Sequence, residues 1–275
     1  MKNQRSKIKN SVDGPIGVFD SGLGGLTVVK ALRQQLPDEP VVYFGDTARV
    51  PYGTKSRESI IRFSEENVAI LLKYKVQMVV VACNSSTSHA LSVLQRTFDL
   101  PIIGVISPGV RKALQVTKNK RIGIIATPAT INSQAYARQI LDADPSVKVI
   151  GQPCPLFVPL VEEGWFNRPV TRTVAQEYLS KVKKFNVDTL ILGCTHYPLL
   201  KSVIAKVMGP QVALIDSAQE VAGEVKELLQ RRGNGGRRNE KKSYYEFLVS
   251  DDPKHFSRLA KKFLGFEIKA AKRVG

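Results

Sequence analysis

Short apolar runs alternate with longer stretches of helical period along most of the chain. The runs are rich in Val, Ile and Leu and have the length of buried strands, whereas apolar residues in the intervals recur at helical spacing. Parallel strands need crossover helices between them, so the alternation predicts an α/β fold built on parallel sheets. The expected strands are residues 16–19, 41–44, 76–82, 102–106, 121–126, 147–151, 189–192, 212–215 and 244–249. Helices are expected in the intervals, among them residues 26–36, 57–74, 170–185 and 253–264, and Pro198 suits the first turn of another.

The alternation is interrupted at residues 231–242, whose sequence is RRGNGGRRNEKK. Three glycines and a run of like charges are typical of a mobile surface loop. We therefore expect the last strand and helix to lie beyond a loop.

A weak internal repeat divides the chain into two halves. The segment IGVFDS at residues 16–21 resembles IGIIAT at 122–127, and VVVACN at 79–84 resembles LILGCT at 190–195. The two separations are nearly equal, so each half repeats the same succession of elements. We expect two similar parallel-sheet α/β domains related by pseudo-symmetry.

Cys83 and Cys194 end equivalent strands in the two halves. Ligands of open α/β sheets bind beyond the carboxyl ends of the strands, so both thiols fall where a site is expected. If the halves face each other, the active site lies in the cleft between them and the thiols approach one ligand from opposite sides. Inverting a carbon that bears an acidic hydrogen needs such a pair, because a base must act on one face and an acid on the other.

Composition and charge narrow the class of protein. The chain has 275 residues, 43% of them apolar and 24% charged, which is typical of a globular protein. No apolar run approaches the roughly 20 residues of a membrane span, no signal peptide is evident, and three scattered cysteines do not form a disulfide framework. These observations favour a cytoplasmic protein. Of the net charge of +17, +15 lies in residues 1–10, 230–242 and 254–275, so any contact with nucleic acid is expected through this basic fringe.

The turn Asp20-Ser21-Gly22-Leu23-Gly24-Gly25 lies between an expected strand and helix, where backbone amides can hold an anion. It is not a dinucleotide fingerprint, because Thr27 stands where the third glycine would fall. Its glycines also have a structural interpretation as positions of positive φ. Asp20 can either cap the helix or handle a proton beside a cysteine.

His196 lies two residues after Cys194 and can tune that thiol, protonate a substrate carboxylate or have a purely structural role. A Cys-x-His pair also occurs in zinc sites, but Cys154, His89 and His255 are too isolated in the sequence to complete one. We therefore expect no metal. A single-cysteine hydrolase is also disfavoured, because it would leave one strand-end thiol without a role.

Five stretches together resemble the glutamate racemase family over roughly residues 16–221. They are IGVFDSGLGGLTV, YFGDTARVPYG, VVACNSST, PCPLFVPLVEEG and ILGCTHYPLL. The resemblance implies a racemase without a cofactor that interconverts L- and D-glutamate and supplies D-glutamate for peptidoglycan synthesis. It also implies that Cys194 takes the α-proton of L-glutamate and Cys83 that of D-glutamate.

The resemblance implies further roles for particular residues. Asp20 assists Cys83, whereas His196 and Glu162 lie with Cys194. Neighbouring Glu163 could be mistaken for Glu162. The implied substrate-holding residues are Asp20, Ser21, Tyr52, Gly53, Asn84, Ser85, Thr195 and His196.

The family's fold implies a first domain of residues 13–107 plus 218–275, a second of residues 108–217, and a basic tail of residues 1–12. We also expect a homodimer. The chain departs from the family in one motif, because it has CNSST at 83–87 where the family usually has CNTAS. Ser85 keeps the hydroxyl of the threonine it replaces, whereas the added hydroxyl of Ser86 could alter the start of the following helix.

Two alternatives stay open. The first is another two-cysteine racemase, acting on aspartate or a similar small acid. The second is a nucleic-acid-associated binding module that uses the basic fringe, whose binding would be sensitive to salt.

Overall fold

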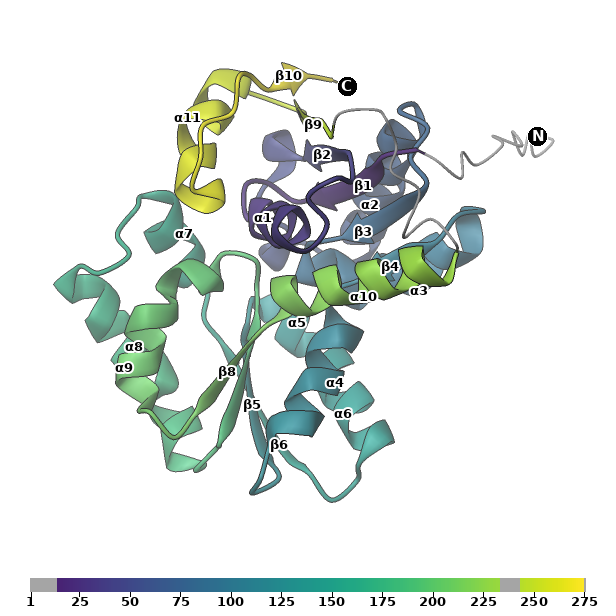
Figure 1. Cartoon of the computed structure of the whole chain (residues 1–275). Coiled ribbons are helices and arrows are strands. Elements are labelled where there is room, and N and C mark those ends of the chain that lie inside the picture. The colour runs from purple at the N-terminus through teal and green to yellow at the C-terminus, as the bar shows by residue number, and fades with distance from the viewer. Residues whose placement is uncertain (1–13, 233–242, 275) are drawn as a thin grey trace.

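The computed structural model describes residues 14–232 and 243–274, and their strands form two parallel sheets (Figure 1). The larger sheet has the order β10-β9-β2-β1-β3-β4 and the smaller the order β6-β5-β7-β8. Strands of the larger sheet are β1 (Ile16–Asp20), β2 (Val41–Gly45), β3 (Met78–Val81), β4 (Ile102–Gly104), β9 (Tyr245–Val249) and β10 (Lys272–Arg273). Those of the smaller are β5 (Arg121–Ala126), β6 (Lys148–Pro153), β7 (Thr189–Gly193) and β8 (Ala213–Asp216).

Four adjacent strands of the larger sheet have the same order as the four strands of the smaller sheet. The order β2-β1-β3-β4 corresponds to β6-β5-β7-β8, so the second, first, third and fourth strands of each half follow one another. The matched segments of the sequence repeat lie in β1 and β5, and in β3 and β7. The predicted fold of two similar parallel-sheet halves is therefore confirmed.

Helices connect the strands, as parallel pairing requires. In chain order they are α1 (Leu26–Gln35), α2 (Arg57–Leu72), α3 (Asn84–Thr97), α4 (Ile106–Val116), α5 (Pro128–Asn132), α6 (Ala135–Ala143), α7 (Phe157–Glu162), α8 (Pro169–Lys184), α9 (Lys201–Met208), α10 (Ser217–Arg231) and α11 (Pro253–Leu264). Three short 3-10 helices are η1 (Thr47–Arg49), η2 (Tyr52–Thr54) and η3 (Tyr197–Leu200).

The chain returns to the first half after completing the second. Helix α10 leaves β8 and packs against both α1 and α4, and β9 then pairs in parallel with β2 (Figure 1). One continuous apolar cluster includes Val28 near the first sheet, Leu192 of β7 and Val221 of α10. The halves therefore share a core. We propose two domains, one of residues 13–107 plus 218–275 and one of residues 108–217. These boundaries place each sheet within a single domain.

Some boundaries differ from those predicted. The strand expected at 102–106 ends at Gly104, because α4 begins at Ile106 and accommodates Pro108 in its first turn. Apolar residues continue from the strand into the helix, so the sequence does not mark where the strand ends. Pro198 lies in the first turn of η3, as predicted, whereas the two-residue strand β10 was not anticipated.

Two predicted segments fall wholly or mostly outside the described residues. They are the basic tail of residues 1–12 and the loop of residues 231–242, of which only the first two residues are described. Within the described ranges, no helix combines the length and apolar character needed to cross a membrane.

Candidate active site

The two cysteines follow equivalent strands. Cys83 comes after β3 and is the N-cap residue of α3, and Cys194 directly follows β7. Both are free thiols, with 5% of Cys83 and 7% of Cys194 exposed. Each therefore lies at the carboxyl edge of a sheet, nearly shielded from water.

The surroundings of Cys83 favour its protonated form. Its thiol donates a hydrogen bond to Ser21 Oγ at 3.7 Å, and Tyr52 and Ile60 pack beside it. Burial, followed by the negative charge of Asp20, raises the pKa of the Cys83 thiol to about 11 although Ser86 and Ser21 act in the opposite direction. At neutral pH this residue is therefore suited to donating a proton.

Asp20 ends β1 and is completely buried. Its Oδ2 accepts a hydrogen bond from the Gly22 N–H at 3.0 Å, and its Oδ1 accepts one from Thr195 Oγ1 at 3.5 Å. Burial raises the pKa of this carboxyl group, while His196 and nearby backbone N–H groups oppose the rise. Asp20 thus links the loop after Cys194 to the site of Cys83.

Cys194 lies beside a buried histidine that is held by a carboxylate. Cys194 Sγ and His196 Nδ1 are 3.9 Å apart, and His196 Nε2 is 3.1 Å from Glu162 Oε1. Burial alone would lower the pKa of His196, but its interactions with Cys194 and Glu162 outweigh burial and raise that pKa to about 10. The imidazole is therefore a cation at neutral pH, and its charge stabilises negative charge on the Cys194 sulfur.

Glu162, rather than Glu163, faces this histidine. Glu162 is the last residue of α7, whereas Glu163 follows it and is exposed. The local sequence PLVEE cannot by itself distinguish adjacent carboxylates, but the direction of the last helical turn does.

Close packing explains the glycines of the turn after β1. None of Gly22, Gly24 and Gly25 has a positive φ, so the structural interpretation of the turn as positive-φ positions was wrong. A Cβ atom on Gly24 would instead lie 2.1 Å from Thr195 Oγ1 and 2.5 Å from His196 Nδ1. The turn therefore has to lack a side chain at this position, because residues 193–196 around Cys194, which we call the second cysteine loop, pack closely against it.

Residues 83–86 around Cys83, which we call the first cysteine loop, also contact the second half of the chain. Ser85 Oγ lies 3.0 Å from Thr127 Oγ1, the N-cap hydroxyl of α5. A Cβ atom on Gly53 would lie 2.6 Å from Thr127 Cβ. Helix α3 begins at Asn84 as a regular helix, so the departure at Ser86 does not disturb the helix start.

Tyr52 does not offer its hydroxyl freely to a ligand. That hydroxyl accepts a hydrogen bond from Asn67 Nδ2 at 3.1 Å and donates one to the buried carboxylate of Asp46.

Several residues that contact the predicted site residues were not themselves predicted. They are Asp46, which holds Tyr52; Thr127, which meets Ser85; Tyr136, which donates to Asn84; and Ser217, which meets the Tyr136 hydroxyl. Each contact joins residues that are far apart in the chain or whose spacing matches no known motif.

The remaining cysteine and the histidines form no second centre. Cys154 is completely buried, and burial raises its pKa far above the usual range, so it is an unreactive thiol. Within residues 14–232 and 243–274, no cluster of His, Cys, Asp and Glu side chains could bind a metal ion.

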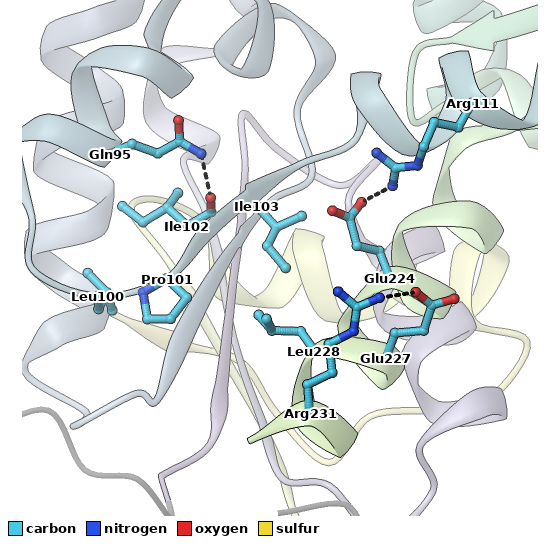
Figure 2. Close-up of a pocket in the computed structure, with 10 residues that line it drawn as sticks. All are labelled: Gln95, Leu100, Pro101, Ile102, Ile103, Arg111, Glu224, Glu227, Leu228 and Arg231. Carbon is cyan, nitrogen blue, oxygen red and sulfur yellow. Dashed lines mark hydrogen bonds and ion pairs between the residues drawn. The ribbon is translucent and has the colours of Figure 1, made fainter. Parts of the chain in front are cut away.

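A cavity beside Cys194 is small. The cavity that contacts Asn84, Cys194 and Thr195 has a volume of only about 10 Å³. A much larger cavity of about 560 Å³ lies between β4, α4 and α10, where Arg111 pairs with Glu224 (Figure 2). Ten cubic ångströms cannot hold an amino acid, so this cavity beside Cys194 is not by itself a substrate site.

The sequence profile of the Asp/Glu/Hydantoin racemase family matches residues 16–225. The chain belongs to this family and is an isomerase of the racemase class. Several proteins to which it is similar are glutamate racemases. It is 49% identical to that of Geobacter metallireducens over 91% of this chain and 92% of the relative.

Solved structures agree with this assignment. A glutamate racemase isoform of Bacillus anthracis is similar with a TM-score of 0.91 and 37% identity, covering 96% of this chain and 98% of that one. The glutamate racemase of Francisella tularensis in complex with D-glutamate is similar with a TM-score of 0.89 and 41% identity, again covering 96% and 98%. The chain therefore groups with the glutamate racemases.

Proposed function

We propose that this racemase interconverts L- and D-glutamate by moving the α-proton between Cys83 and Cys194 without a cofactor. The observation that carries the proposal is the unequal setting of the two equivalent thiols. A raised pKa keeps Cys83 protonated, whereas Cys194 lies 3.9 Å from the cationic His196. One thiol is thus ready to give a proton and the other to take one.

In the proposed reaction, the Cys194 thiolate removes the α-hydrogen of L-glutamate as a proton. The electron pair of the broken C–H bond remains on the α-carbon, and the Cys83 thiol delivers its proton to the opposite face. Cys194 then holds a proton and Cys83 a negative charge, which is the form that accepts D-glutamate for the reverse direction. His196 stays cationic throughout and balances the charge at Cys194.

Removal of this weakly acidic hydrogen needs a preorganised and dry site. Hydroxyl and amide groups of Ser21, Asn84, Ser85 and Thr195 are proposed to hold the carboxylates and the ammonium group, with the backbone at Tyr52 and Gly53. Closure of the halves on the ligand would exclude water, which strengthens each of these interactions.

The names of the relatives favour glutamate over aspartate as substrate. A role in supplying D-glutamate for peptidoglycan, a cytoplasmic location and a homodimeric state remain proposals of the same kind.

The test is incubation of the protein with L-glutamate in D2O without added cofactor. We expect loss of the α-hydrogen signal in the NMR spectrum together with decay of optical rotation to zero. Cys83→Ser and Cys194→Ser should each lower the rate of racemisation about 10²- to 10⁴-fold, whereas Cys154→Ser should retain it. Full activity in either of the first two variants would contradict the two-base scheme. Racemisation of aspartate but not of glutamate would show that the proposed substrate is wrong.

A further inference from the structure

Tyr136 of α6 joins the second half to the first cysteine loop. Its hydroxyl donates a hydrogen bond to Asn84 Oδ1 at 2.7 Å, and Asn84 is the residue after Cys83. The phenol oxygen also lies 3.1 Å from Ser217 Oγ, at the start of α10. Only 2% of Tyr136 is exposed.

The ring of the same tyrosine packs against the second cysteine loop. A Cβ atom on Gly193, the residue before Cys194, would lie 3.2 Å from Tyr136 Cε2. A Cβ atom on Gly109 of α4 would lie 3.9 Å from Cε1 on the other edge of the ring. One side chain therefore contacts the neighbours of both cysteines.

The hydrogen bonds around the phenol have a fixed direction. Burial is the main cause that raises the pKa of Tyr136, so the phenol keeps its single proton. Because that proton goes to Asn84 Oδ1, Ser217 must donate to the phenol oxygen. The amide of Asn84 is then held with its oxygen toward Tyr136, which leaves the two N–H groups of Nδ2 as donors for a ligand.

We propose that Tyr136 is a positioning residue that fixes the two cysteine loops relative to each other and aims the Asn84 amide at the substrate. This inference rests on the proposed racemisation of glutamate for its kinetic test. Its structural content, the spacing of the two loops, does not depend on which substrate is used.

The kinetic test compares Tyr136→Phe with the unaltered enzyme in a double-mutant cycle with Asn84→Ala. Tyr136→Phe keeps the ring and removes only the oxygen, so kcat/KM should fall about tenfold, with a higher KM for glutamate. In the Asn84→Ala background the same change should have almost no further effect. Tyr197→Phe is the matched control, because it also removes a buried hydroxyl, one that donates to the Cys154 carbonyl at 2.8 Å. Its effect should combine independently with that of Asn84→Ala.

A second measurement needs no turnover. Dibromobimane links two nearby thiols, so the fraction of protein cross-linked between Cys83 and Cys194 reports the spacing of the loops. This fraction should fall in Tyr136→Phe and stay unchanged in Tyr197→Phe. Equal effects of Tyr136→Phe in both backgrounds, or an unchanged cross-linked fraction, would overturn the inference. Normal cross-linking without any racemisation by the unaltered protein would instead refute the proposed function.

Discussion

His196 Nε2 lies 3.1 Å from Glu162 Oε1, and this contact joins the end of α7 to the loop that carries Cys194. The carboxylate is one reason why the imidazole remains protonated although it is buried. The charge beside Cys194 therefore depends on a residue 34 positions earlier in the chain.

Replacing the carboxylate should change how activity depends on pH. Glu162→Gln removes a negative charge from His196, so the pKa of the imidazole should fall from about 10 toward its usual value. We expect about a tenfold lower kcat at neutral pH and an alkaline limb of the pH–rate profile that begins at lower pH. Glu163→Gln is the matched control, because it neutralises the exposed neighbour and should leave the profile unchanged.

The same histidine should make stability depend on pH. The pKa of His196 is raised from 6.5 to about 10, so the native state binds an extra proton between these values. Its stabilising contribution is therefore complete below about pH 6.5 and is lost as pH rises through about 10. In a Cys194→Ser background, in which no thiol titrates beside His196, the free energy of unfolding should fall by roughly 1–2 kcal/mol between about pH 6.5 and 9, and adding His196→Asn should flatten this slope.

Urea unfolding at a series of pH values would measure this slope. The series should stop near pH 9, because the pKa of Cys83 is raised from 9.0 to about 11 and adds a fall of the same sign above that point. An unchanged slope in His196→Asn would show that another group is responsible.

A single methyl group in the turn after β1 should inactivate the enzyme. In Gly24→Ala the new Cβ atom would lie 2.1 Å from Thr195 Oγ1, so the second cysteine loop must move. We expect at least about a hundredfold loss of kcat/KM while circular dichroism remains native, because a misplacement of about 1 Å costs this much. In Gly223→Ala, the control, the nearest atom is 3.6 Å away, and stability should rise by about 0.5–1 kcal/mol because the site is within α10.

Ser86→Ala should raise the pKa of Cys83. The Ser86 hydroxyl is buried, and its interaction with the Cys83 thiol lowers the pKa of that thiol. The pH midpoint of Cys83 alkylation, followed in a Cys194→Ala background, should increase by about one unit.

Ser88→Ala is the corresponding control. Its hydroxyl lies on the same helix but donates to the Ser85 carbonyl at 2.9 Å, so the midpoint should stay where it is. Equal midpoints in all three proteins would mean that Ser86 only fills space.

The parts of the fold that repeat in sequence could be predicted, because burial on both faces produces an apolar run wherever a parallel strand occurs. Strands β1 and β5 and the cysteines after β3 and β7 were found in this way. The junction of β4 and α4 was not, because apolar residues continue from one element into the other.

Contacts between residues of the candidate site could be predicted where they lie within short motifs, and were missed where they join distant parts of the chain. Cys194 and His196 are neighbours in sequence, but Tyr136 meets Asn84 across 52 positions and no spacing rule connects them. The contact of Asp46 with Tyr52 was missed although it is local, because a buried carboxylate is indistinguishable from an exposed one in a sequence.

The unequal electrostatics of the two thiols have a kinetic consequence. In the proposed two-base reaction, a resting enzyme with a protonated Cys83 is prepared for L-glutamate, and each conversion to the D-enantiomer would leave it in the opposite proton state. The enantiomers have the same free energy in water, so kcat/KM must be equal in the two directions. The difference between the two thiols can therefore alter kcat and KM only by the same factor. The enantiomer with the lower KM must also have the lower kcat.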